Sequence, residues 1–292
     1  MLSLLANYAW FELVSPVTLV VVGLLIFWYN RTMVKSPQFH ATSTQKTYFT
    51  LAISLFFLVK GTPFAVIADH YLASALLLQL SIMAFAVVPL FILSLPREYL
   101  KVFLWHHRRA KVAKFIFAHP WPLAVVFNGL ITFFIVPPVF NAITANEWLL
   151  FLYEVVLITF AFLVWWIIIQ PAAEISEHSY FTRGAYVFLM ALFLMPVAIF
   201  LIVAQNPLYT NYIAVSGELL PALTAHSDQQ LAGGFLKLLQ LSSFSIAIYF
   251  LLKRWRFEEV ENEGKVDDDT VVVQGILIKL SDYNRRTKGR KR

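Results

Sequence analysis

The sequence predicts an all-α membrane protein: a bundle of seven transmembrane helices with the N-terminus outside the membrane and the C-terminus in the cytoplasm. Three observations predict it: the composition, seven separate apolar runs, and an alternation of basic and non-basic loops. Of the 292 residues, 59% are hydrophobic and 14% are charged, and the mean hydropathy is +0.69. A soluble domain has only roughly 45 to 50% apolar residues. Because there is no cysteine, disulfides, thiolate zinc sites and thiolate catalysis are excluded.

Each apolar run is a candidate span, since about 17 to 25 residues are needed to cross a hydrocarbon core about 30 Å thick. The runs cover residues 14–29, 49–67, 71–95, 123–136, 148–169, 185–203 and 230–252. The second run is interrupted by Lys60-Gly61-Thr62-Pro63. Backbone polar groups must be satisfied within lipid, and the alternation of a membrane β-barrel is absent, so the runs are predicted to be helices. Residues 1–256 are therefore predicted to form the transmembrane domain.

The loops predict the orientation. Basic residues occur in the first loop (Arg31, Lys35, Lys46) and the third (Arg97, Lys101, Arg108, Arg109, Lys111, Lys114), whereas the second, fourth and sixth loops have none. Lys and Arg concentrate in cytoplasmic loops, so these two loops are predicted to be cytoplasmic. The net charge of +6 then marks one face of the membrane, and no nucleic-acid partner is expected.

Residues 257–292 are predicted to form a charged cytoplasmic tail. Its acidic part, EEVENEGKVDDDT, is typical of disorder, and VVVQGILIKL favours either a short strand or a segment lying on the membrane. The final RRTKGRKR is expected to bind anionic membrane lipid, at about 1 kcal/mol per basic residue near the surface. Docking to a partner protein is the alternative.

Polar residues gather at the outer ends of two predicted spans. Asp69 and His70 precede the third span, and His226-Ser227-Asp228-Gln229-Gln230 precedes the seventh. If these ends are neighbours, two imidazoles and two carboxylates converge, and imidazole with oxygen ligands suits copper. Asp69, His70, His226 and Asp228 are therefore the candidate metal ligands. The alternative is that each aspartate caps its own helix by accepting hydrogen bonds from the first-turn amides.

Further polar side chains are predicted inside the spans. They are Gln79 in the third, Glu154 in the fifth, and Lys237 and Gln240 in the seventh. Ionisable groups at such depths are costly and usually face a bundle interior or a water-filled cavity. Glu154 and Lys237 are expected either to pair with each other or to serve in transport or binding.

The seventh-span stretch DQQLAGGFLKLLQ (228–240) resembles the last-helix signature of the CtaG-type cytochrome c oxidase assembly factors, a seven-helix membrane family. Other stretches resemble that family in the same order, over roughly residues 49–255. They are Lys60-Gly61-Thr62-Pro63, SALLLQLSIMAFAVVPLFILSLP (74–96), His119-Pro120, Phe127-Asn128, Pro138-Val139-Phe140-Asn141, and Trp165-Trp166 with Pro171.

The resemblance implies a non-catalytic chaperone in the bacterial cell membrane that assists maturation of a haem-copper oxidase. It implies an oxidase subunit as partner and copper as the supplied metal. The chain departs from the family at ligand-bearing positions. Leu76-Leu77 replaces a His-Met pair, a histidine expected near the end of the fourth span is replaced within Ile135-Val136-Pro137, and Tyr153-Glu154 stands where another histidine is expected. Copper binding has therefore either moved to His70 and His226 with their carboxylates, or been replaced by a scaffold role.

Two other classes of protein stay open. A retinal-type pigment also has a lysine in its last helix, as Lys237 is here, but the third span has no carboxylate to serve as counter-ion. A small-molecule transporter would use Glu154, Lys237 and the interrupted second span, although no internal repeat is apparent.

Overall fold

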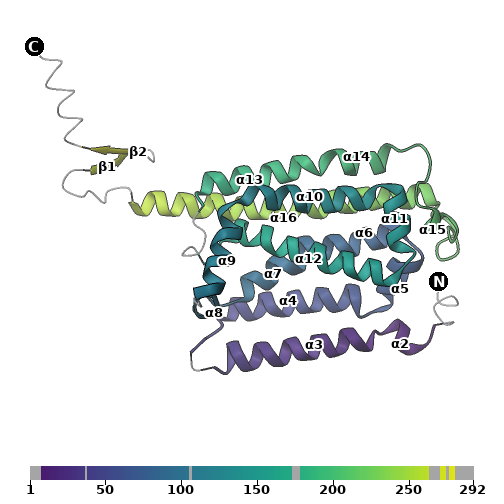
Figure 1. The fold of residues 1–292 in the computed structure, drawn as a ribbon, viewed down its shortest axis with the longest axis horizontal. Helices are drawn as coiled ribbons and strands as arrows, with labels where there is room; N and C mark the ends of the chain where they lie inside the picture. The colour runs from purple at the N-terminus through teal and green to yellow at the C-terminus, as the bar shows by residue number, and fades with distance from the viewer. Residues whose placement is uncertain are drawn as a thin grey trace, which may run out of the picture. The chain divides into compact units, whose positions relative to one another are not determined.

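The computed structural model describes residues 8–36, 38–104, 107–172, 178–262, 270–273 and 276–279 (Figure 1). The chain divides into two compact units, Met1–Ser245 and Ile246–Arg292, with the division inside the last helix. The first unit is a helical bundle whose long helices lie side by side along a common axis.

Helices occur at all seven predicted spans. In chain order they are α3 (Pro16–Tyr29) with the π-helix η1 (Asn30–Val34); α4 (Ser43–Lys60) with α5 (Pro63–His70); α6 (Ala73–Ile82), η2 (Met83–Val87) and α7 (Val88–Ser94); α10 (Pro120–Ile135); α12 (Glu147–Ile169); α13 (Tyr180–Phe193) with α14 (Met195–Val203); and α16 (Ala225–Asn262). The shorter helices are α2 (Trp10–Leu13), α8 (Arg97–Leu104), α9 (His107–Ala118), α11 (Pro137–Thr144) and α15 (Thr210–Ile213).

By length and apolar composition, five of these helices can cross a membrane, or up to seven if each bent pair forms one span. The all-α multi-pass fold predicted from the sequence is therefore confirmed. The side of the membrane on which each terminus lies stays a prediction.

Local sequence signals explain where several helices begin. Ser15 accepts a hydrogen bond from the backbone amide of Thr18 at the start of α3, just before Pro16. Thr42 and Gln45 form a reciprocal capping box at the start of α4. Such side chains satisfy amides that have no partner within the first turn.

Three spans are interrupted within the bundle. α4 and α5 meet at a bend of 53°, at Gly61-Thr62 and just before Pro63. The third span widens into η2 immediately before Pro89, and the sixth span breaks at Leu194, before Pro196. Proline lacks a backbone N–H and clashes with the preceding turn, so each interruption leaves carbonyl groups without their usual helical donor.

The third span is the central element of the bundle. Its segments contact α4 and α12, and 61% of its most apolar stretch is buried, compared with 17% for the first span. Around it, Phe85 makes edge-to-face contacts with Phe127 and Phe244, and all three rings are buried. Such ring pairs add to the burial energy and fix the packing.

In the tail, β1 (Thr270–Val273) pairs antiparallel with β2 (Ile276–Lys279), so the stretch for which the sequence favoured either a short strand or a membrane-lying segment forms two paired strands. The beginning of the acidic stretch, predicted to be disordered, is instead helical, because α16 continues to Asn262. The basic stretch 285–292 lies outside the described residues.

Candidate functional site

The ends of several spans meet at one end of the bundle, together with α5, α11 and α15; we refer to it as the α15 end (Figure 1). Asp228 lies there in the first turn of α16. Its carboxylate accepts hydrogen bonds from the backbone amides of Ala73 (2.8 Å) and Ser74 (3.2 Å) and from the Ser74 hydroxyl. Asp228 is therefore a cap, but of the neighbouring helix α6. The prediction that it caps its own helix is wrong, since the α16 start is bound by Thr224.

The two glutamines after Asp228 bind the end of α14 and the loop that follows. Gln229, which is 1% exposed, accepts from the Leu208 amide (2.7 Å) and donates to the Leu201 carbonyl (3.3 Å). Gln230 donates to the Ile202 carbonyl (2.9 Å). The last carbonyls of a helix have no internal donor, so these amides satisfy groups that are costly to leave bare in a membrane.

The four candidate metal ligands have different surroundings. Nε2 of His226 donates to the Ala204 carbonyl (2.9 Å), and the ring of His70 stacks at 6.5 Å on Tyr8. Oδ1 of Asp69 is buried with no hydrogen-bond partner among the described residues, and Asp228 is occupied by α6. Within that part of the chain, no three His, Cys, Asp or Glu side chains form a group that could hold a metal ion.

Two tyrosines between the sixth and seventh spans connect the helix ends further. The Tyr212 hydroxyl donates to the Ala68 carbonyl of α5 (2.8 Å), and the Tyr209 hydroxyl donates to the Ile135 carbonyl of α10 (3.0 Å). Burial raises the pKa of both phenols, and for Tyr212 the nearby aspartates add to the effect. Both hydroxyls therefore remain protonated donors far into alkaline pH.

The buried charge at Glu154 is paired with Lys60 of α4. The pairing of Glu154 with Lys237 predicted from the sequence is wrong, because Lys60 lies at the break of the second span and its ammonium reaches α12. The Gln79 side-chain amide lies 2.8 Å from Lys60 Nζ and 2.6 Å from the Val59 carbonyl, and it satisfies both when its oxygen faces the ammonium. Three spans thus share one buried polar cluster.

Lys237 and Gln240 satisfy the break in the sixth span. Nζ of Lys237 donates to the Ala191 carbonyl (2.8 Å) and to Gln240 Oε1 (2.9 Å), while Nε2 of Gln240 donates to the Met190 carbonyl (3.1 Å). These carbonyls lie in the last turn of α13, just before the interruption at Leu194.

The π-helical turn in the third span is satisfied in the same way. Nε1 of Trp165 donates to the Ala84 carbonyl (2.9 Å), and the Ser243 hydroxyl donates to the Phe85 carbonyl (2.5 Å). Polar side chains within the spans therefore recur where a neighbouring helix is interrupted. They donate hydrogen bonds to backbone carbonyls that the interruption leaves without a helical donor.

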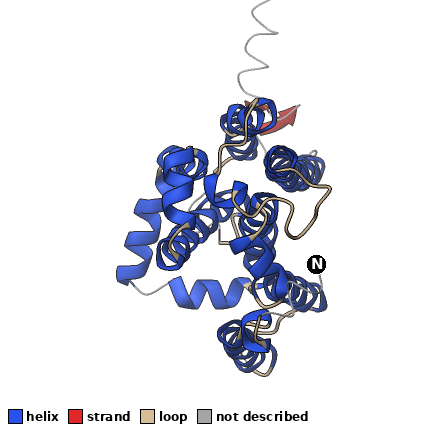
Figure 2. Cartoon of the chain, turned by 90° about the vertical axis from the view of Figure 1, so that its right-hand side faces the viewer, coloured by secondary structure: helices blue, strands red, loops and turns tan. Residues whose placement is uncertain are grey.

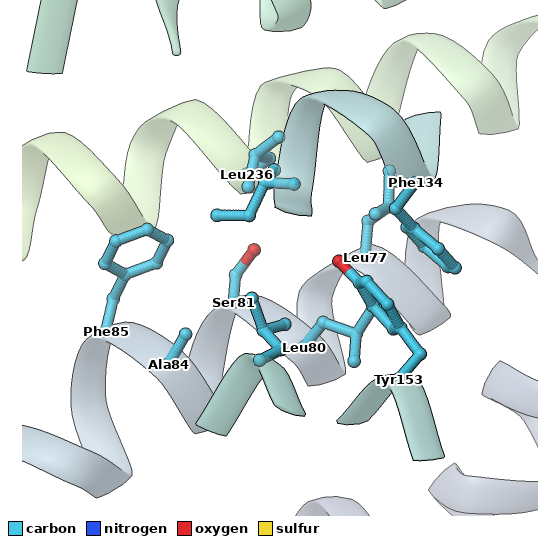
Figure 3. A pocket seen from close by; sticks show the side chains of 10 residues that line it. Leu77, Leu80, Ser81, Ala84, Phe85, Phe134, Tyr153 and Leu236 are labelled. Carbon is cyan, nitrogen blue, oxygen red and sulfur yellow. The ribbon is translucent and has the colours of Figure 1, made fainter. Parts of the chain in front are cut away.

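One small cavity lies at positions where the sequence departs from the family pattern (Figure 3). Leu77, Tyr153 and Phe134, the last adjacent to Ile135, line a space of about 10 Å³, roughly what one water molecule requires. Its polar atoms include the buried hydroxyl of Ser81, which has no hydrogen-bond partner in the described part of the chain, and the Tyr153 hydroxyl also faces the space. Copper in proteins takes imidazole or sulfur ligands, so this donor set does not fit copper.

Sequence reasoning missed Lys60, Ser74, Tyr212 and Arg183 as functional partners. Arg183, which is 5% exposed, donates to the carbonyls of Ile168 and Ile169 at the end of α12. Arg183 lies in the first turn of α13, where a cation is unfavourable for its own helix, and this was a usable signal that it binds the negative, C-terminal end of a neighbouring helix. For the other three, no local pattern indicates the distant partner.

Comparison with known proteins gives the family. The family model for the cytochrome c oxidase caa3 assembly factor matches residues 27–258, which include every site residue described above except Tyr8. Comparison with curated proteins and with solved structures found no match. The match extends from α3 into α16 and so covers most of the chain. On this match, the chain belongs to the cytochrome c oxidase caa3 assembly factor family.

Proposed function

We propose that this protein assists maturation of a haem-copper terminal oxidase in the bacterial cell membrane, without catalysing a reaction, by holding an oxidase subunit against its helical bundle. The observation that carries the proposal is the family match over residues 27–258. A cytochrome c oxidase assembly factor needs a surface for the oxidase, and in the membrane that surface consists of packed helix faces.

The internal contacts support a scaffold role. Asp228 joins α16 to α6, Gln229 joins it to α14, and the Lys60–Glu154 pair joins α4 to α12. Each contact fixes two spans relative to each other at a buried polar point. Large side chains remain exposed on the lipid-facing sides, including Phe133 at 63% and Trp148 at 80%. Helices associate in membranes by van der Waals packing of such surfaces, so a rigid bundle can present a fixed face to a subunit.

Copper binding by His70, His226 and their carboxylates stays a prediction. The contacts of His226 and Asp228 with backbone groups provide no shared ligand set, so the proposal includes no copper-transfer step. Metal analysis of the purified protein after copper exposure and dialysis, alongside the His70→Ala/His226→Ala variant, tests it. The prediction requires about one retained copper per chain and a clear loss in the double variant. Equal retention by both proteins would remove these histidines from any copper role.

Deletion of the protein tests the assembly role. We expect the deletion strain to lose most of its terminal oxidase activity while oxidase subunits are still synthesised, and expression of the intact protein to restore the activity. Oxidase activity, haem content and copper content of the membranes are measured together. A fully active and fully metallated oxidase in the deletion strain would contradict the proposal.

The alternative hypothesis, a small-molecule transporter, predicts a different result for a variant of Glu154. Replacement of Glu154 would abolish uptake of a solute into vesicles even if the oxidase still matured. The scaffold hypothesis predicts that Glu154→Gln lowers oxidase maturation only in proportion to the loss of folded protein. It also predicts no change in solute uptake by vesicles.

A further inference from the structure

We propose that α8 and α9 form a surface that binds the anionic headgroups of phospholipids at the end of the bundle opposite α15. These two helices cross the end of the bundle, whereas the spanning helices are seen end-on in Figure 2 (compare Figure 1). The segment Arg109–Ala118 of α9 is bent by 77° from α10. A helix at this angle to a span lies close to the plane of the membrane.

One face of α9 is packed against the bundle. Ala113 and Phe117, four residues apart and therefore on the same face, are both buried. The Phe117 ring stacks on Trp166 at 5.4 Å, and Nε2 of His178 donates to the Phe117 carbonyl at 2.8 Å. The position of α9 is thus fixed by contacts with α12 and with the residues just before α13.

The other faces of α9 are exposed and differ in chemistry. Val112 and Phe115, three residues apart, share an apolar face and are 59% and 75% exposed. Lys111 and Lys114 are also three residues apart and share a basic face. Within the part of the chain that the structure describes, neither lysine has a hydrogen bond or an ion pair. An exposed apolar face beside a basic face is typical of a helix that lies in the membrane interface.

α8 extends this surface. Val102 and Phe103 are 65% and 47% exposed, and Leu100 is buried. The Arg109 guanidinium lies 4.8 Å from the centre of the Phe103 ring, and Nη1 donates to the Phe103 carbonyl at 3.5 Å. These contacts hold α8 against the beginning of α9. The two helices together expose a group of apolar side chains, and an exposed apolar patch of this kind is typical of a surface that binds a membrane or a partner.

The basic face favours anionic lipid over a second apolar protein surface. The charged groups of Lys111 and Lys114 would be costly inside the hydrocarbon, so in the bent pair Arg109–Ala118 with Pro120–Ile135 we take α10 as the part that crosses the hydrocarbon and α9 as the part at its edge. The loop-charge prediction assigns this end to the cytoplasmic side, where the leaflet surface is negative. An ammonium group near that surface binds headgroup phosphates, and the neighbouring Phe115 enters the boundary between headgroups and acyl chains.

The absence of cysteine makes a direct test possible, since a single introduced cysteine carries the only label in the chain. Full-length Val112→Cys, Phe115→Cys, Lys111→Cys and Lys114→Cys variants are spin-labelled and placed in nanodiscs that contain phosphatidylglycerol. We expect labels at 112 and 115 to collide preferentially with oxygen, and labels at 111 and 114 with a water-soluble nickel complex. Equal access of nickel to all four positions would overturn the proposal.

Lipid selectivity is measured by the competition of labelled phosphatidylglycerol with phosphatidylcholine for the protein. Lys111→Gln/Lys114→Gln is compared with Lys35→Gln/Lys46→Gln, a matched loss of two exposed lysines, one after η1 and one in the first turn of α4. For the α9 variant we expect the ratio of phosphatidylglycerol to phosphatidylcholine binding to fall by up to about five-fold for each lysine removed. For the control variant we expect a much smaller fall in this ratio. An equal loss in both variants would show a diffuse charge effect and overturn the site. Burial of the labels only after an oxidase subunit is added would also overturn it and identify a protein occupant.

Discussion

Asp228 binds both the backbone amide and the side-chain hydroxyl of Ser74, 154 residues earlier in the sequence. The carboxylate thus lies at the positive end of α6 while it also forms part of the first turn of α16. One side chain of the family-like DQQ stretch therefore fixes the third span to the seventh, which identifies a structural role for that stretch.

Replacing Asp228 tests this role. Asp228→Asn removes the charge and Asp228→Ala also removes the acceptor, so we expect losses of about 1 and 3 kcal/mol in the free energy of unfolding. Unfolding in detergent by denaturant titration measures both. Glu218→Gln, which removes an exposed carboxylate from the preceding loop, is the control. If Asp228→Ala were as stable as that control, the cap would have no energetic importance.

The Lys60–Glu154 pair predicts a specific coupling. Lys60→Met or Glu154→Gln alone leaves one buried charge without its partner and should cost about 3 to 5 kcal/mol, whereas the double variant should recover much of this loss. A double-mutant cycle on unfolding free energies measures the coupling. The same cycle with Glu154→Gln and Lys237→Met should be additive within about 0.5 kcal/mol. Coupling of Glu154 to Lys237 instead would contradict the structure.

Two adjacent glycines offer a matched pair of substitutions. A Cβ on Gly233 would lie 2.9 Å from the Ala198 carbonyl oxygen and 2.9 Å from Leu201 Cβ, whereas nothing lies within 4 Å of a Cβ on Gly234. Gly233→Ala should therefore separate α16 from α14 and cost about 1 to 3 kcal/mol. Gly234→Ala should stabilise the helix by about 0.5 to 1 kcal/mol. Thermal unfolding of both variants checks the sign, and similar effects of the two would refute the close contact.

Two adjacent tryptophans make a second matched pair. Trp165 donates to the Ala84 carbonyl in the π-helical turn, while the buried indole N–H of Trp166 has no hydrogen-bond partner among the described residues. Both changes to Phe remove similar apolar volume, so we expect Trp165→Phe to cost about 1 to 3 kcal/mol more than Trp166→Phe. Unfolding free energies give the comparison. A larger loss for Trp166→Phe would show that ring packing outweighs carbonyl satisfaction at this turn.

The amino-acid sequence alone was enough to predict that the chain lies in a membrane, that it is helical, and where its spans lie. These follow from local properties: an apolar run of sufficient length must be helical in lipid, and prolines such as Pro63 and Pro196 interrupt a helix wherever it packs. The sequence also contained the DQQ stretch that indicates the family, which the family match confirmed. None of these properties depends on which helices are neighbours.

Which polar groups contact each other depends on helix packing and could not be predicted from the sequence. Glu154 has Lys60 and Lys237 as candidate partners at similar depths, and only the packing of α12 against α4 and α7 selects Lys60. Asp228 has the amides of its own helix close by in sequence, yet α6 begins against it and takes both carboxylate oxygens. A charge or a freed carbonyl in a membrane is satisfied by whatever group the bundle brings within hydrogen-bond distance, and that neighbour is set by helix packing rather than by sequence spacing.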